Sequence, residues 1–211
     1  MKIIVVAGGS LLNPHIFKAM VSRADRVVCA DGGAAHLSSM GIVPHVIMGD
    51  LDSISPSHQR NFETAGVEFI RHPVDKDYTD TELAAQWAVK NGATNITFLG
   101  TTGNRMDHTL ANIFLMEKIA AMGVGCSMVD DHNEIHLIQD QITLEKSPGI
   151  YLSLLPISQK VTGITLTGLV FPLTNATLYR GDSTGISNRF EASTARISLE
   201  TGLLMVTLSH D

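Results

Sequence analysis

Several aspartates gather in one stretch of the chain with a spacing that suits the binding of a cation. They are Asp50, Asp52, Asp75, Asp77 and Asp80, with Asp31 just upstream. In an extended segment residues i and i+2 project to the same side, so Asp50 and Asp52 can face one ion. Carboxylates held together repel one another unless a cation offsets their charge. Oxygen ligands without clustered Cys or His favour a hard ion, so the pattern predicts Mg²⁺ rather than Zn²⁺.

A glycine-rich segment, residues 100–108 (GTTGNRMDH), supplies groups that suit phosphate. Its glycines let backbone N–H groups approach an anion closely, and Arg105 offers a forked, charged donor. Mg²⁺ held by a few aspartates usually completes its shell with water and phosphate oxygens. The two segments together therefore predict a nucleotide or diphosphate substrate. The glycine-rich segment is not a Walker A loop, and Gly8-Gly9-Ser10 lacks the spacing of a dinucleotide fingerprint.

Each segment alone also has a purely structural interpretation. Asp80 falls in the first turn of a predicted helix, where the helix dipole already favours an anion. Asp107 could simply cap the helix that follows it, and residues 75–80 could form a solvated loop. However, all these residues follow apolar runs that are typical of strands. Ligands of an open α/β sheet collect at the carboxyl ends of its strands, so the combination favours a binding site.

The elements that must position these residues alternate over the first 130 or so residues. Short apolar runs and helical patterns take turns, which predicts a mainly parallel, Rossmann-like α/β sheet. We expect strands at 3–7, 26–30, 45–48, 68–71, 96–99 and 126–129. We expect helices that start near Pro14 and Pro56 and helices at 80–90 and 108–122, the last with Leu110, Ile113, Phe114 and Ile119 facing the core.

From about Asn133 the pattern changes to short alternating runs separated by glycines. Strands are expected at 134–139, 150–155, 161–166, 176–179, 195–200 and 203–208. Closely spaced strands with turn residues between them are typical of an antiparallel β-sandwich. We therefore expect two domains, an α/β domain over 1–131 and a β-sandwich over 132–211.

Composition limits the partners and the compartment. The chain has 211 residues, of which 44% are hydrophobic, and its net charge is −6. An acidic protein has neither nucleic acid nor an anionic membrane as a default partner, and no apolar run is long enough to span a bilayer. Cys29 and Cys126 lie inside apolar runs, so we expect buried, reduced thiols in a cytoplasmic protein.

Five ordered motifs give the chain a specific resemblance. They are Asp31-Gly32-Gly33, Gly49-Asp50-Leu51-Asp52-Ser53, residues 75–80 (DKDYTD), residues 103–108 (GNRMDH) and Gly185-Ile186-Ser187-Asn188. Their order and spacing resemble the thiamine pyrophosphokinase (thiamine diphosphokinase) family. One departure is Asn104, where the family usually carries a second glycine. Asparagine tolerates unusual backbone angles, so we expect little effect.

The resemblance implies a transferase that moves the diphosphoryl group of ATP to the hydroxyl of thiamine and releases AMP. It also implies a nucleotide- and Mg²⁺-binding N-terminal domain, a thiamine-binding sandwich, and a homodimer with active sites between subunits. By motif position, the implied Mg²⁺ ligands are Asp50, Asp52 and Asp80. The implied contacts to ATP are Asp31, Lys76, Thr79 and Arg105, and those to thiamine are Ser187 and Asn188.

Some roles stay open at this stage. Asp77 and Asp107 are both candidates for the base that accepts the proton of the thiamine hydroxyl. Stacking on the thiamine ring would fall to Phe171, Tyr179 or Phe190, since no tryptophan follows Trp87. Two alternatives compete with the thiamine kinase: an enzyme that diphosphorylates another alcohol, such as a hydroxymethylpterin, and a sensor that binds without turnover. The dense carboxylates argue against the sensor, because simple binding would not need so many like charges.

Overall fold

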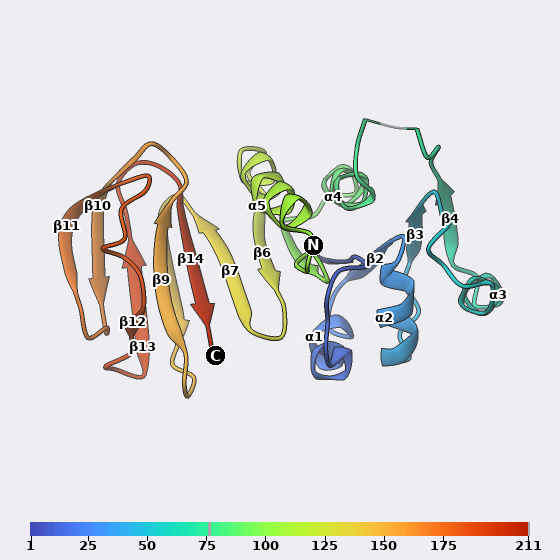
Figure 1. Cartoon of the computed structure of the whole chain (residues 1–211), viewed down its shortest axis with the longest axis horizontal. Helices are drawn as coiled ribbons and strands as arrows, with labels where there is room; N and C mark the ends of the chain where they lie inside the picture. Colours follow the sequence, from blue (N-terminus) through green and yellow to red (C-terminus); the bar gives the residue numbers. More distant parts are fainter. Residues whose placement is uncertain (76, 211) are drawn as a thin grey trace. The chain divides into compact units, whose positions relative to one another are not determined.

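The computed structural model describes residues 1–75 and 77–210, and its chain forms two compact units. Unit 1 is Met1–Asp131 and unit 2 is His132–Asp211. The open α/β sheet lies in unit 1 and the antiparallel strands lie in unit 2, as the sequence predicts (Figure 1). Among the described residues no helix is long and apolar enough to cross a membrane.

Unit 1 is built on six parallel strands in the order β6-β5-β1-β2-β3-β4. Their bounds are Lys2–Val6 (β1), Arg26–Ala30 (β2), Val46–Gly49 (β3), Glu68–Arg71 (β4), Asn95–Leu99 (β5) and Gly125–Val129 (β6). The central strands are continuous apolar runs, which is the composition that a parallel sheet covered on both faces requires. Each observed strand lies within about a residue of its predicted position.

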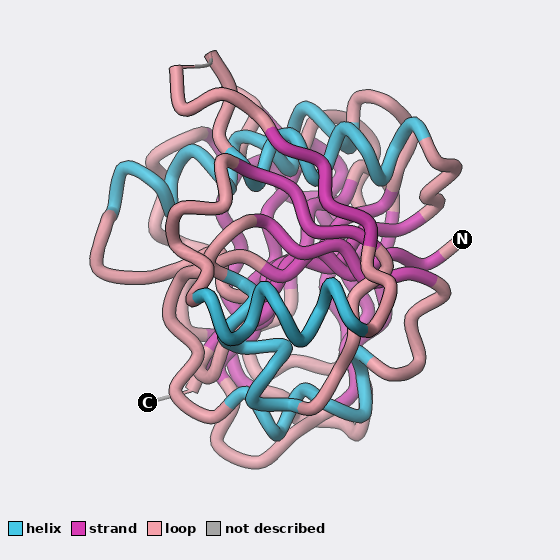
Figure 2. The backbone as a smooth tube through the Cα atoms, turned by 90° about the vertical axis from the view of Figure 1, so that its right-hand side faces the viewer, coloured by secondary structure: helices cyan, strands magenta, loops and turns pink. Residues whose placement is uncertain are grey.

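Helices cover both faces of this sheet, with α1 and α2 on one side and α4 and α5 on the other (Figures 1 and 2). Their bounds are Pro14–Phe17 (a 3₁₀ turn, η1), Lys18–Val21 (α1), Gly33–Met40 (α2), Pro56–Thr64 (α3), Asp80–Lys90 (α4) and Met106–Ala120 (α5). Two predicted helix starts are capped as expected. The Ser55 side chain accepts a hydrogen bond from the His58 backbone N–H, and Thr79 accepts one from Glu82.

Two expectations about helices are wrong. The sequence predicts Leu110 and Phe114 in the core, but they are 44% and 59% exposed. Helix α5 instead buries Leu115, Met116 and Ile119, together with a polar residue, Asn112. The buried Asn112 holds a loop, as described below, and apolar periodicity alone does not detect such a residue. Helix α2 was not predicted, because it begins directly at a glycine pair that resembles a turn.

Unit 2 is a two-sheet sandwich. One sheet has the order β12-β9-β14-β7 and the other β11-β10-β13-β8, with antiparallel pairing throughout. The bounds are Asn133–Ile138 (β7), Gln141–Glu145 (β8), Tyr151–Pro156 (β9), Lys160–Thr167 (β10), Leu173–Tyr179 (β11), Asn188–Arg189 (β12), Thr194–Ser198 (β13) and Leu204–Ser209 (β14). Alternate apolar residues of the two sheets share one core, for example Leu154 of β9, Ile164 of β10 and Val206 of β14. Strand β8 was not predicted.

The two cysteines are free and buried, as expected. Burial raises the pKa of the Cys126 thiol to about 12, and burial raises that of Cys29 further, with a contribution from the charge of Asp31. At neutral pH both thiols are therefore protonated and act as small apolar side chains.

The contact between α2 and β1 gives a testable prediction. A Cβ atom on Gly33 would overlap the carbonyl group of Val6, which belongs to a central strand and cannot move aside. Gly33→Ala should therefore lower the free energy of unfolding by at least about 3 kcal/mol, measured by urea denaturation. Gly123→Ala is the control, because nothing lies within 4 Å of the added Cβ there. Its positive φ should cost only about 1 kcal/mol, and equal effects of the two changes would contradict this packing.

Candidate active site

The order of the strands creates a crevice at one edge of the unit 1 sheet. The chain runs outward from β1 through β2, β3 and β4, and then returns to place β5 on the other side of β1. The loops that follow β1 and β5 therefore leave the sheet in opposite directions, which is where open α/β sheets bind ligands.

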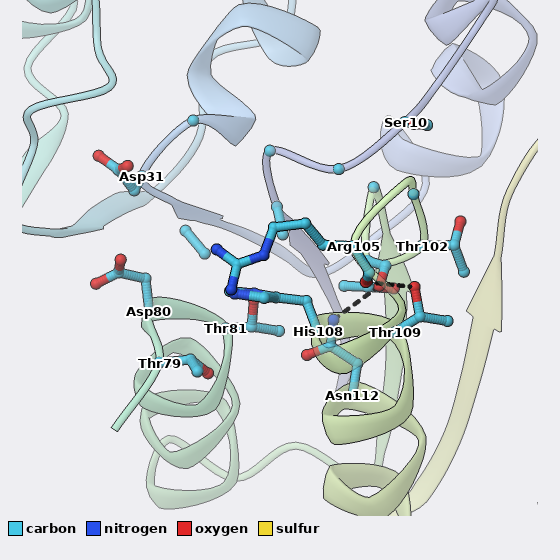
Figure 3. A pocket seen from close by; sticks show the side chains of 18 of the residues that line it. Ser10, Asp31, Thr79, Asp80, Thr81, Thr102, Arg105, His108, Thr109 and Asn112 are labelled. Carbon is cyan, nitrogen blue, oxygen red and sulfur yellow. Dashed lines mark hydrogen bonds between the residues drawn. The ribbon is translucent and has the colours of Figure 1, made fainter. Parts of the chain in front are cut away.

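A pocket of about 590 Å³ opens at this point. It is lined by the turns after β1, β2 and β5 and by the first turns of α4 and α5 (Figure 3). Of the residues predicted for the site, four line it: Asp31, Thr79, Asp80 and Arg105. Figure 3 shows Asp31 and Asp80 close together, with Arg105 and His108 reaching in from α5.

Backbone contacts fix the two glycine-rich loops against each other. The N–H of Gly9 donates to the carbonyl of Gly100 at 2.6 Å, and the N–H of Ser10 donates to that of Thr102 at 2.8 Å. A Cβ on Gly9 would overlap both carbonyl oxygens, so only glycine allows this approach. These N–H groups are therefore used inside the protein and are not available to a phosphate.

Free N–H groups lie further along the second loop. Among the described residues, the backbone N–H groups of Gly103, Asn104 and Arg105 have no hydrogen-bond acceptor. They lead directly into α5, whose first turn adds the positive end of a helix dipole. The Thr101 hydroxyl, in the same loop, is buried and has no partner among the described residues. This side of the pocket is suited to an anion.

The opposite side carries carboxylates. One oxygen each from Asp31, Asp50 and Asp52 lies within 4.8 Å of the others. Asp80 is adjacent, because a Cβ placed on Gly49 would lie 3.0 Å from both the Asp31 Cβ and the Asp80 Oδ1. Asp31, which the resemblance implies only as a contact to ATP, thus joins the acidic group.

The backbone at this group is strained. Asp31 and Leu51 have φ values of 37° and 68°, in a region that only glycine adopts freely. The Asp31 N–H donates to the Met48 carbonyl at 2.9 Å, which holds the turn after β2 against β3. Such outliers persist only where the surroundings impose them, and they cluster at functional sites.

Electrostatics make Asp31 a candidate ligand for a cation. Burial raises the pKa of its carboxyl group, the nearby Ser53 hydroxyl offsets part of that rise, and the charges of Asp50, Asp80 and Asp52 raise the pKa further. The Oδ1 atom of Asp31 is buried and has no hydrogen-bond partner among the described residues. An orphaned carboxylate oxygen beside other carboxylates fits a hard metal ion.

Arg105 and Asp107 form an exposed ion pair at the start of α5, with Nη2 and Oδ2 2.6 Å apart. Hydrogen bonding to Arg105 is the main reason that the pKa of Asp107 lies below its usual range. Asp107 does not cap α5, whose N-cap residue is Arg105. Neither Asp107 nor Asp77 lines the pocket, and Lys76 lies outside the described residues.

In unit 2 the two predicted thiamine contacts differ in character. Asn188 is buried, and its side-chain amide is occupied by the backbone of Phe171, accepting from the N–H at 3.0 Å and donating to the carbonyl at 2.7 Å. Ser187 is exposed, has a φ of 58°, and is held by a hydrogen bond from its N–H to the Ser153 hydroxyl. Of the candidate aromatic rings, Phe190 is buried, whereas Phe171 and Tyr179 are exposed.

Sequence reasoning missed several residues of the site. Ser53 was quoted only as part of a motif, yet its hydroxyl donates to Asp52 Oδ1 at 3.0 Å. His108 is given no role of its own within the motif at residues 103–108, and the sequence does not single out Asn112, but both line the pocket, and the Asn112 amide donates to the Thr101 carbonyl at 2.7 Å. A polar residue inside an apolar helical stripe is the signal that could have identified Asn112.

Comparison with known proteins gives a consistent result. Residues 17–127 match the family model "Thiamin pyrophosphokinase, catalytic domain", and residues 136–204 match "Thiamin pyrophosphokinase, vitamin B1 binding domain". The thiamine pyrophosphokinase of Bacillus subtilis is 33% identical over 183 residues, which are 86% of each chain. A crystal structure of the Bacillus subtilis enzyme has a TM-score of 0.91 at 30% identity, covering 100% of both chains. That of the Geobacillus thermodenitrificans enzyme has a TM-score of 0.84 at 32% identity, covering 100% of this chain and 98% of the other.

Fold, site and comparisons together define a transferase of the kinase class. More narrowly, the chain belongs to the thiamin pyrophosphokinase family, whose catalytic and vitamin B1 binding domains it matches in order.

The raised pKa of Asp31 gives a prediction for the metal-free protein. A carboxyl group whose pKa is raised by folding loses stability as the pH rises through that pKa, because the folded state then holds an unfavourable charge. Asp31→Asn should therefore raise the melting temperature of metal-free protein at pH 8, by a few degrees at most because the side chain is partly exposed. The gain should disappear below about pH 4, where Asp is protonated in both states. Asp140→Asn, at an exposed turn, is the control, and an equal gain there would contradict the explanation.

Proposed function

We propose that this enzyme uses Mg²⁺ to transfer the diphosphoryl group of ATP to the hydroxyl of thiamine, giving thiamine diphosphate and AMP. The observation that carries the proposal is the pocket of unit 1, with carboxylates on one side and Arg105 with the free N–H groups before α5 on the other. A metal–triphosphate complex needs both kinds of group at once. The match of unit 2 to the vitamin B1 binding domain supports thiamine as the acceptor.

The carboxylates would hold the metal. Asp50 and Asp52 are the first ligands we assign, Asp80 is the third that the motifs imply, and Asp31 is added because of its orphaned Oδ1 atom. When bound there, Mg²⁺ neutralises charge that develops on the phosphoryl oxygens. Ser53 supports the ligands by donating to Asp52.

The phosphate side would bind through the chain's own donors. The N–H groups of residues 103–105 and the Arg105 guanidinium would stabilise negative charge as the bond between the β-phosphorus and the oxygen of the α-phosphate breaks. Arg105 would exchange its exposed partner Asp107 for a phosphate oxygen. We also assign Thr79 and Lys76 to the phosphates, although the Thr79 hydroxyl already caps α4.

The thiamine hydroxyl attacks the β-phosphorus, AMP departs, and the hydroxyl proton passes to a carboxylate. Asp77 and Asp107 both stay candidates for this acceptor, because the hydrogen bond that lowers the pKa of Asp107 would be lost once Arg105 turned to a phosphate. On unit 2 we assign the Ser187 hydroxyl to contact thiamine, and we assign Asn188 to hold Phe171, the exposed ring that would stack on it.

We further propose that the chain acts as a cytoplasmic homodimer with active sites between subunits. Helix α5 supports a dimer, because Met106, Leu110 and Phe114 follow one another at helical spacing and are 64%, 44% and 59% exposed. An exposed apolar stripe of this kind is typical of an interface.

The reaction predicts a specific product. When the protein is mixed with ATP, Mg²⁺ and thiamine, AMP and thiamine diphosphate should form in equal amounts, as measured by liquid chromatography. Transfer of a single phosphoryl group would instead release ADP, so ADP formed in an amount equal to the thiamine consumed would contradict the proposal. Replacing thiamine with a hydroxymethylpterin should give no AMP.

The metal assignment predicts the effect of Asp52→Asn. Losing one charged ligand should lower kcat by at least about a hundredfold, while circular dichroism and the melting temperature stay close to those of the unchanged protein. Asp140→Asn serves as the matched control and should keep full activity. Activity that survived Asp52→Asn would show that the metal lies elsewhere.

A further inference from the structure

We propose that His36 is a positioning residue for the nucleotide, which fixes the loop after β1 and thereby the separation between the acidic and the phosphate-binding sides of the pocket. This inference rests on the proposed function. His36 lies on α2, outside every motif that the sequence analysis identified, and its Nε2 atom is 2.8 Å from the carbonyl oxygen of Gly9.

The direction of this hydrogen bond is settled by chemistry. A carbonyl oxygen can only accept, so the Nε2 atom of His36 carries the hydrogen. The imidazole ring also lies against the second loop, because a Cβ on Gly100 would be 3.5 Å from the His36 Cδ2. One side chain thus contacts both loops from behind the pocket.

The loop after β1 needs such an anchor. Glycine has more backbone freedom than any other residue, and Gly8 and Gly9 are adjacent. A larger residue cannot replace Gly9, since its Cβ would overlap the carbonyls of Gly100 and Thr102. Hydrogen bonds order the loop. The N–H groups of Gly9 and Ser10 donate to the loop after β5, His36 donates to the Gly9 carbonyl, and the Asp131 carboxylate accepts from the N–H groups of Leu12 and Asn13. Of these contacts, the His36 bond is the one that a side chain makes to the glycine pair.

The position of α2 explains why this anchor matters for the substrate. Helix α2 begins at Gly33, two residues after Asp31 of the acidic group. Gly8 packs against Gly32 so closely that a Cβ on Gly8 would lie 3.0 Å from the Gly32 Cα. The carboxylate of Asp31 therefore lies just before the N-terminus of this short helix, and His36 of the same helix contacts the loops after β1 and β5. The loop after β5 leads to Arg105. A metal–triphosphate complex must fit between these two sides.

His45 provides a matched comparison within unit 1. Its Nδ1 atom accepts a hydrogen bond from the backbone N–H of Val27 at 3.0 Å, so it also binds a backbone group. Neither histidine lines the pocket, but His36 binds Gly9, which does, whereas His45 binds Val27, which does not. A purely structural histidine at either position should affect folding alone.

The test compares four variants by titration with a non-hydrolysable ATP analogue and Mg²⁺ in a calorimeter, and by steady-state kinetics. His36→Leu removes the donor, His36→Gln keeps an N–H at a similar reach, His36→Glu replaces that donor with an acceptor, and His45→Leu is the control. Loss of one hydrogen bond with an unsatisfied carbonyl should weaken analogue binding by about tenfold in His36→Leu. The KM for ATP should rise by about the same factor, and the KM for thiamine should stay unchanged.

We expect His36→Gln to restore analogue binding to within about threefold, and His36→Glu to behave like His36→Leu. His45→Leu should lower the melting temperature without changing analogue binding. The proposal is overturned if His36→Leu binds the analogue normally, or if both KM values change together. If His36→Leu does not fold, the comparison of His36→Gln with His36→Glu tests the proposal instead. Equal binding of the analogue by these two variants would exclude a role for the N–H donor at position 36. Analogue binding does not depend on turnover, so this result stands apart from whether the wild-type enzyme releases AMP.

Discussion

The constraint on which the site depends is the repulsion among carboxylates held at one edge of a buried sheet. Asp31, Asp50 and Asp52 converge there, although burial and the charges of its neighbours oppose the ionisation of Asp31. Left-handed backbone at Asp31 and Leu51 adds to the cost. A chain tolerates such a cluster only where the rest of the domain holds it in place, and here the two-sided packing of the parallel strands supplies that support. This unfavourable arrangement is what supports the proposed cation site.

The second requirement is that the phosphate-binding side stays at a fixed distance from this acidic group. Strand order alone brings the loops after β1 and β5 together, but it does not fix their conformation. Hydrogen bonds between the backbones of Gly9 and Gly100 hold the loops, together with those that the His36 and Asn112 side chains make to the loop carbonyls. These side chains are polar and lie outside the sequence motifs. The geometry of the site therefore depends on residues that take no part in its proposed chemistry.

The strands were predictable because their apolar runs are bounded by turn residues, and α4 was predictable because Thr79 is a recognisable cap. The inward face of α5 was not predictable in the same way, because its buried residues include Asn112. This side chain is buried for its hydrogen bond and not because it is hydrophobic. The sequence also placed the aspartates at strand ends. The sequence could not show that Asp31 lies beside Asp50 and Asp52, from which it is about twenty residues distant along the chain. That closeness results from the pairing of β2 with β3.

In the motif at residues 185–188, two adjacent polar residues have different structural roles. Both functional atoms of the Asn188 amide are satisfied by the backbone of Phe171, so a ligand could use them only by breaking buried hydrogen bonds. Ser187, in contrast, is exposed and held in a left-handed conformation that Asn188 and Ser153 impose on either side. A polar residue next to a binding residue therefore need not touch the ligand. In the proposed thiamine site, Asn188 fixes the backbone of Phe171, and the role proposed for His36 in the loops of unit 1 is of the same kind.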